Sequence, residues 1–122
     1  MFGTSTEIID ECKQRLLQKK SELINRMHEN KNDYFSRDKG SDEGDQSMSA
    51  LAETTFLSAQ ERLRKQVLEI ELALGRIDRG VYGICEETEE PIEKDRLLAI
   101  PWTRLSIEGA EIQDSMRRRY AK

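Results

Sequence analysis

Cysteine and histidine are scarce in this chain, which has 2 Cys and 1 His in 122 residues. The two cysteines, Cys12 and Cys85, lie far apart, so they form no disulfide framework and suit a reducing cytoplasm. The one histidine, His28, has no Ser, Cys or acid placed to complete a catalytic triad, and no glycine-rich phosphate loop occurs. We therefore expect a protein that is not an enzyme.

Long apolar runs and a secretory leader are also missing. No apolar run approaches the roughly 18 residues that a membrane span needs, and the amino terminus lacks a basic region followed by an apolar one. The sequence therefore predicts a soluble, cytoplasmic protein that does not enter a membrane.

The charge balance is mildly acidic, with 20 basic and 24 acidic residues and a net charge of -4. This is the wrong sign for binding nucleic acid chiefly through its phosphates, so we expect no direct sequence-specific contact with nucleic acid. Hydrophobic and charged residues each make up 36% of the chain, which excludes a thick core. Ala, Glu, Lys, Leu and Arg supply 55 of the 122 residues, close to the roughly 50% typical of long helices.

Two stretches show helical periodicity. In the first, Thr4 and Glu7 have the spacing of a capping box, and apolar residues follow at helical intervals. The second contains a heptad seam made of Phe56, Leu63, Val67, Ile70, Leu74 and Ile77. Residues 30–49 between them are polar, as is typical of a loop or of frayed helix ends. The pattern predicts an antiparallel two-helix coiled-coil hairpin over residues 1–79, with an acidic tip loop at about 33–48.

After Gly80 the pattern changes to dense apolar residues without one period. We expect a small globule over residues 80–122, anchored by Tyr82 and Trp102, with a last helix that begins at about Leu105 and ends in a basic run. Units of fewer than about 40 residues usually need a metal, disulfides or docking to stay folded. The predicted fold class is all-α dominated: a long hairpin, a small globule and a C-terminal helix.

Two sets of charged residues each have two interpretations. Asp42 and Asp45 suit an N-cap and a solvated turn, or they are acids that the hairpin inserts near a metal or a basic partner. Arg62, Arg64 and Lys65 suit an ordinary charged outer face of a helix, or they contact an acidic partner. Composition alone leaves both questions open.

Cys85 begins a segment that looks like a zinc knuckle without its ligands. Structural zinc needs four donors, and one Cys with His28 on a distant segment does not supply them. Between Glu86 and Asp95 there are six acids and one base, which we expect to form a solvated loop, with hard-cation binding as the alternative. No metal and no other cofactor is therefore expected.

Three segments and one short motif resemble a known family. Residues 73–85, 90–92 and 96–101 are similar to the end of the coiled coil and the C4 zinc finger of the DksA/TraR family. The motif Asp42-x-x-Asp45-x-Ser47 is similar to the Asp-x-x-Asp-x-Ala motif at the family's coiled-coil tip, and its distance from Cys85 fits without a gap. The resemblance covers roughly residues 7–120. It implies binding to bacterial RNA polymerase through the secondary channel, with Asp42, Asp45 and Ser47 at the tip nearest the active site.

The finger departs from the family pattern at three of its four cysteines. The ligand positions are Cys85, Thr88, Ser106 and Gly109 in this sequence. The resemblance therefore implies a degenerate finger that keeps the fold without zinc. Burial of large side chains, at roughly 1.5 to 3 kcal/mol each, would replace the metal. The side chains expected to do so are Val81, Tyr82, Ile92, Leu97, Trp102 and Leu105.

The resemblance also bears on the stringent response. Family members that respond to the alarmone ppGpp hold it with basic side chains, and the matching positions here are Glu69, Ile100 and Ala110. The resemblance thus gives no support for ppGpp binding. Arg62 and Lys65 match basic positions on the family's second coiled-coil helix, where they would face the polymerase channel.

The function predicted from the sequence is that of a transcription regulator, expected to be monomeric, which binds RNA polymerase without breaking a bond in a substrate. The alternative is a structural or adaptor coiled-coil protein that self-associates through the heptad seam. A third possibility is a factor that uses the tip acids to recruit a second Mg²⁺ to the polymerase and so stimulates transcript cleavage.

Overall fold

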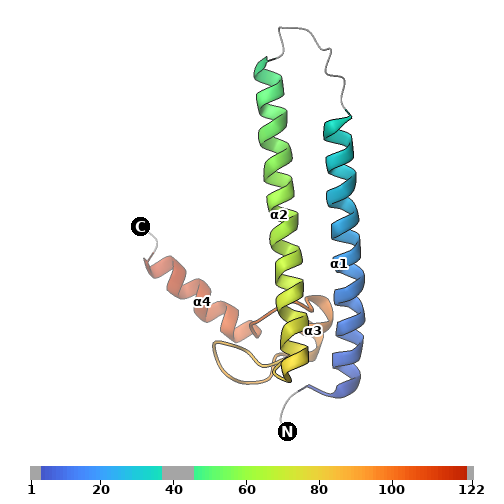
Figure 1. The fold of residues 1–122 in the computed structure, drawn as a ribbon. Helices are drawn as coiled ribbons and strands as arrows, with labels where there is room; N and C mark the ends of the chain where they lie inside the picture. The colour runs from blue at the N-terminus through green and yellow to red at the C-terminus, as the bar shows by residue number, and fades with distance from the viewer. Residues whose placement is uncertain (1–3, 37–45, 121–122) are drawn as a thin grey trace. The chain divides into compact units, whose positions relative to one another are not determined.

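The fold is mainly helical in the part of the chain that the computed structural model describes, residues 4–36 and 46–120. Within these ranges no strand forms, and one isolated antiparallel bridge joins Ile84 to Pro91. The all-α dominated class predicted from the sequence is confirmed, and no described helix is long and apolar enough to cross a membrane. The helices, drawn in Figure 1, are α1 (Thr6–Phe35), α2 (Gln46–Arg79), α3 (Lys94–Ala99) and α4 (Ile107–Tyr120).

Helix α1 is capped by Ser5. The Ile8 amide donates to Ser5 Oγ at 3.3 Å and the Ile9 amide donates to the Ser5 carbonyl at 3.0 Å. The capping-box spacing had pointed to Thr4, one residue earlier. At its other end α1 continues to Phe35, beyond the polar residues at which a loop was expected to begin.

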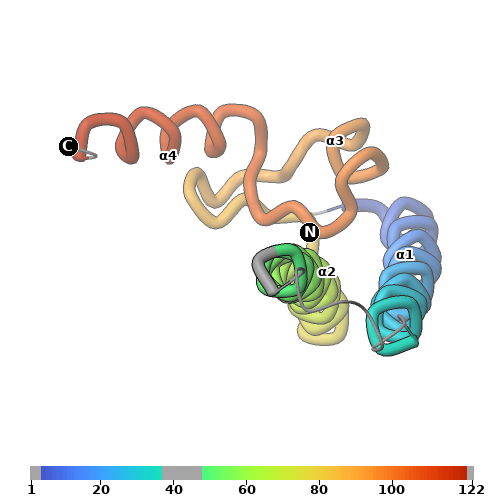
Figure 2. Tube along the Cα trace, turned by 90° about the horizontal axis from the view of Figure 1, so that it is seen from above, coloured from blue at the N-terminus to red at the C-terminus, as the bar shows by residue number. Residues whose placement is uncertain are grey.

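The described residues group into two compact units, and the first comprises residues 19–68. Here α1 and α2 run side by side in opposite directions (Figures 1 and 2). Tyr34, late in α1, stacks on Phe56, early in α2. One turn after Phe56 in α2, Gln60 Nε2 donates to the Met27 carbonyl of α1 at 3.4 Å. Leu63 of the heptad seam is buried in this unit. Phe56 and Val67 of the seam are half-buried, so the seam packs in part against α1 within this unit.

The second unit comprises residues 1–18 and 69–122. Its core contains Cys12 and Leu16 of α1, Ile70 and Ala73 of α2, the loop residues Tyr82, Cys85 and Ile92, and Leu97 of α3. Tyr82 Oη donates to the Pro101 carbonyl at 2.8 Å, so the expected tyrosine anchor is present. Gly83 has a φ of +87°, and a Cβ there would collide with the Thr4 side chain.

Three residues expected in this core are not fully buried, and one of them, Leu105, is half-buried where the chain leads into α4. Val81 is 47% exposed, because the chain turns at Gly80 with a φ of +77° and the Val81 amide bonds back to the Arg76 carbonyl at 3.0 Å. Trp102 is only half-buried. The last helix begins at Ile107, two residues after the position predicted.

Candidate functional site

The four finger positions come together in the second unit. The Thr88 amide donates to Cys85 Sγ at 3.4 Å, and the Gly109 amide donates to Ser106 Oγ at 3.0 Å. A Cβ on Gly109 would collide with Cys85 Sγ, so a larger residue there would force the sulfur to move. Cys85, Ser106 and Gly109 are buried. We call these four residues the sulfur cluster.

A short turn carries the first two members of the sulfur cluster. The Cys85 amide donates to the Glu90 carbonyl and the Glu89 amide to the Cys85 carbonyl, both at 2.8 Å. Glu89 takes a left-handed backbone conformation, with a φ of +62°, that tightens the turn. The Glu86 amide donates to the Arg104 carbonyl at 2.9 Å, which brings the turn to the segment that leads into α4. The run of acids predicted to be a solvated loop is thus part of an ordered turn.

The donor chemistry of the sulfur cluster does not fit a structural zinc ion, which takes four Cys, His or carboxylate donors. The cluster offers one thiol and two hydroxyls, and Gly109 has no side chain. Over residues 4–36 and 46–120, no group of three or more His, Cys, Asp and Glu side chains is placed to hold a metal ion.

The Cys85 thiol is acidic in this environment. Burial raises its pKa, but hydrogen bonds from Ser106 and Thr88 outweigh burial and lower the pKa from 9.0 to about 6. At neutral pH the group is therefore mainly a thiolate, which accepts hydrogen bonds in the place where the family has a metal–sulfur bond.

Three arginines hold the segment around the sulfur cluster through backbone carbonyls. Arg76 Nη2 donates to the Trp102 carbonyl at 3.2 Å, and Arg96 Nε donates to the Leu105 carbonyl at 2.7 Å. Arg15 Nη1 donates to Leu98 O at 2.7 Å. Arg76 is buried, and its pKa is lowered because burial disfavours the charged form. Sequence reasoning missed these roles.

The basic residues predicted on the face of α2 are exposed. Arg62 and Lys65 line a small surface pocket with Leu57, Ser58 and Glu61. Arg64 pairs with Glu61, and this hydrogen bond lowers the pKa of the Glu61 carboxyl. Arg62 and Lys65 are both exposed, and the charge of Lys65 also lowers the pKa of Glu61.

The tip acids cannot be placed in the same way. Asp42 and Asp45 lie outside the described residues. Ser47 lies in the first turn of α2, and only its backbone is described. Their role stays a prediction.

Comparison with known proteins is consistent with this geometry. A family model described as the prokaryotic dksA/traR C4-type zinc finger matches residues 80–115. The RNA polymerase-binding transcription factor DksA of Caulobacter vibrioides is 34% identical over 107 residues, which are 87% of this chain and 75% of that protein. An uncharacterized protein of Aquifex aeolicus is 33% identical over 109 residues, which are 86% of this chain and 75% of that protein.

The fold has a solved counterpart. The structure of transcription factor DksA2 from Pseudomonas aeruginosa superposes with a TM-score of 0.86 at 33% identity, over 93% of this chain and 88% of that one. Sequence similarity along most of the chain, a matching finger region and a matching fold lead to the same conclusion, which confirms the resemblance noted from the sequence: the chain belongs to the DksA/TraR family.

Proposed function

We propose that this protein is a transcription regulator that binds RNA polymerase through the secondary channel and carries no catalytic activity of its own. The observation that carries the proposal is the 34% identity, over 87% of this chain, to a protein named an RNA polymerase-binding transcription factor. The antiparallel packing of α1 and α2 in residues 19–68 supports it, because two paired helices are stiff enough to enter a narrow passage.

The acids at the hairpin tip are the proposed effectors. In the secondary channel, Asp42 and Asp45 would lie nearest the polymerase active site, where a desolvated carboxylate interacts strongly with metal ions and basic side chains. A preference of a few kcal/mol for one state of the polymerase is enough to change the lifetime of promoter complexes. Sequence-specific contact with DNA is not required.

Arg62 and Lys65 are the proposed contacts along the hairpin. Both are exposed on α2, and they would meet acidic side chains of the polymerase. Glu69, Ile100 and Ala110 replace the basic side chains with which family members hold ppGpp, so we propose a regulator without that alarmone site.

We also propose that the protein acts in the cytoplasm and that its finger region folds without zinc. The sulfur cluster supplies one thiolate and hydrogen-bonding hydroxyls in place of four thiolates. Packing of Gly109 against Cys85 Sγ fills the space at the centre of the finger.

The test of the tip mechanism is Asp45→Asn. We expect this variant to bind core RNA polymerase as the wild type does and to lose its effect on promoter-complex lifetime, because the charge is removed while the shape is kept. Asp38→Asn removes one charge from the same segment outside the tip motif and should keep the effect. Unchanged lifetimes with Asp45→Asn, against a clear wild-type effect, would rule out a tip-driven mechanism.

A further inference from the structure

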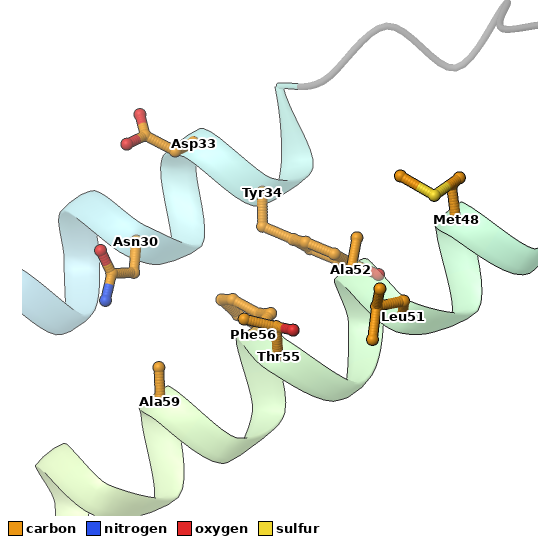
Figure 3. A pocket seen from close by; sticks show the side chains of 9 residues that line it. All are labelled: Asn30, Asp33, Tyr34, Met48, Leu51, Ala52, Thr55, Phe56 and Ala59. Atoms are coloured by element: carbon orange, nitrogen blue, oxygen red, sulfur yellow. The ribbon is translucent and has the colours of Figure 1, made fainter. Parts of the chain in front are cut away.

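A groove lies between α1 and α2 in the unit formed by residues 19–68. It has a volume of about 470 Å³ and is open to solvent (Figure 3). We call it the tip groove, because it lies at the ends of the helices that flank residues 37–45. Its lining includes Asp33, Tyr34, Met48, Leu51 and Phe56.

Aromatic rings form one wall of the tip groove. Tyr34 reaches across from α1 to α2 (Figure 3) and stacks on Phe56, with ring centroids 4.3 Å apart and an interplanar angle of 11°. Phe35 packs edge-on against Tyr34 at 5.1 Å and against Phe56 at 6.0 Å. Such pairs add to the stability gained from burial, so this wall is preformed before any partner binds.

The other wall exposes apolar side chains. Met48 is 63% exposed and Leu51 is 60% exposed, although both face the groove. Residues 37–45, the segment between the two helices, contain no hydrophobic side chain. That segment therefore has nothing with which to fill an apolar groove, and a preformed groove with exposed apolar walls is typical of a docking site.

The charge around the groove specifies the kind of partner. Among the described residues 29–36 and 46–56, the acids Glu29, Asp33 and Glu53 outnumber the one base, Lys31. Asp33 lines the groove itself. Repulsion disfavours nucleic acid or a second copy of this acidic surface, whereas a basic partner is attracted.

We propose that the tip groove binds an apolar side chain that a basic segment of RNA polymerase presents. The apolar side chain packs against Leu51 and the aromatic wall, and the flanking cations face Asp33. The inference rests on the proposed function for its partner and adds to it a contact surface made of described residues on both helices.

The test compares two exposed leucines of α2. Leu51→Ser removes an apolar wall of the groove, and Leu72→Ser alters a leucine that is 48% exposed and lies outside it. We expect Leu51→Ser to weaken binding to core RNA polymerase about tenfold, with an unchanged thermal unfolding midpoint, and Leu72→Ser to bind like the wild type. Met48→Ser, on the same wall, should weaken binding in the same direction.

The charge requirement is tested with Asp33→Asn, against Asp78→Asn at the far end of α2. Asp33→Asn should weaken binding to core RNA polymerase severalfold and reduce the dependence of that binding on salt. Asp78→Asn should change neither the affinity nor its salt dependence.

Three outcomes would overturn the proposal. If wild type binds polymerase and Leu51→Ser binds equally well, the tip groove is not a contact, although the proposed function stands. If the wild type does not bind polymerase at all, both fall. If sedimentation shows a wild-type dimer that Leu51→Ser dissociates, the groove joins two copies of this chain instead.

Discussion

The Cys85 sulfur shows how single residues can replace a metal site. Its partners, Thr88 and Ser106, carry donors where the family has further cysteines, and Gly109 brings the start of α4 against the sulfur. An anion in a buried position is costly unless it is hydrogen-bonded. Here the hydrogen bonds outweigh that cost, since the net effect is a lowered pKa.

This lowered pKa predicts a pH dependence of stability. The folded-state pKa of about 6 lies below the ordinary value of 9.0, so the folded protein binds fewer protons than the unfolded chain between these values. The free energy of unfolding should therefore rise with pH from about 6 to about 9, by about 1.4 kcal/mol per pH unit from this group, and the gain should be lost as pH falls through 6. Urea unfolding across this range measures the slope.

The matched variants are Cys85→Ala and Cys12→Ala. Cys85→Ala removes the thiolate and should flatten the slope of the free energy of unfolding against pH. Cys12→Ala removes the other buried cysteine and should leave that slope unchanged. An equal slope in Cys85→Ala and the wild type would show that Cys85 is not the titrating group.

Helix α2 is both one side of the hairpin and a support for the loops around the sulfur cluster. Its buried residues Ile70 and Ala73 are followed about one turn later by the buried Arg76, which donates to the Trp102 and Thr103 carbonyls at 3.2 and 3.4 Å. This buried cation thus links the end of α2 to the loop that precedes α4.

Removal of that link should be costly. Arg76→Ala leaves the Trp102 and Thr103 carbonyls without their partner, so we expect the free energy of unfolding to fall by about 2 kcal/mol. Arg79→Ala, which alters an exposed arginine in the last turn of the same helix, should change it by less than about 0.5 kcal/mol. Denaturant titration of the two variants distinguishes them, and similar losses would contradict a specific role for Arg76.

The elements were predictable to different degrees. The heptad seam predicts α2 because its period is local, and the basic run suits the end of α4. The end of α1 was not predictable, because Tyr34 and Phe35 extend the helix through ring contacts with Phe56 on the other helix. Helix α3 has only six residues, too few to show a period.

For the molecule as a whole, the sequence resemblance identified the four finger positions but not what holds them. That the thiol of Cys85 is acidic follows from the approach of Ser106, which lies 21 positions later in the chain. Such a contact leaves no periodic signal. Arg76 gave a weak signal, since it continues the spacing of buried residues in α2, whereas nothing local indicated that Arg15 or Arg96 bonds to carbonyls.

The whole protein should be insensitive to metal chelation. The thermal unfolding midpoint should be the same with and without EDTA, because the sulfur cluster has one thiolate instead of the four that zinc takes in this family. A triple variant with Thr88→Cys, Ser106→Cys and Gly109→Cys should bind one zinc ion per chain and become sensitive to EDTA. A wild-type midpoint that falls on chelation, with zinc found in the purified protein, would contradict the prediction.

The packing of Gly109 against Cys85 also constrains how this lineage can evolve. Reversion of position 109 alone would push a Cβ into the sulfur, and with two thiols the site would still lack the ligands to retain zinc. A path back to a zinc site that changes position 109 first would therefore pass through a destabilised intermediate, so positions 88 and 106 would have to acquire cysteines before it.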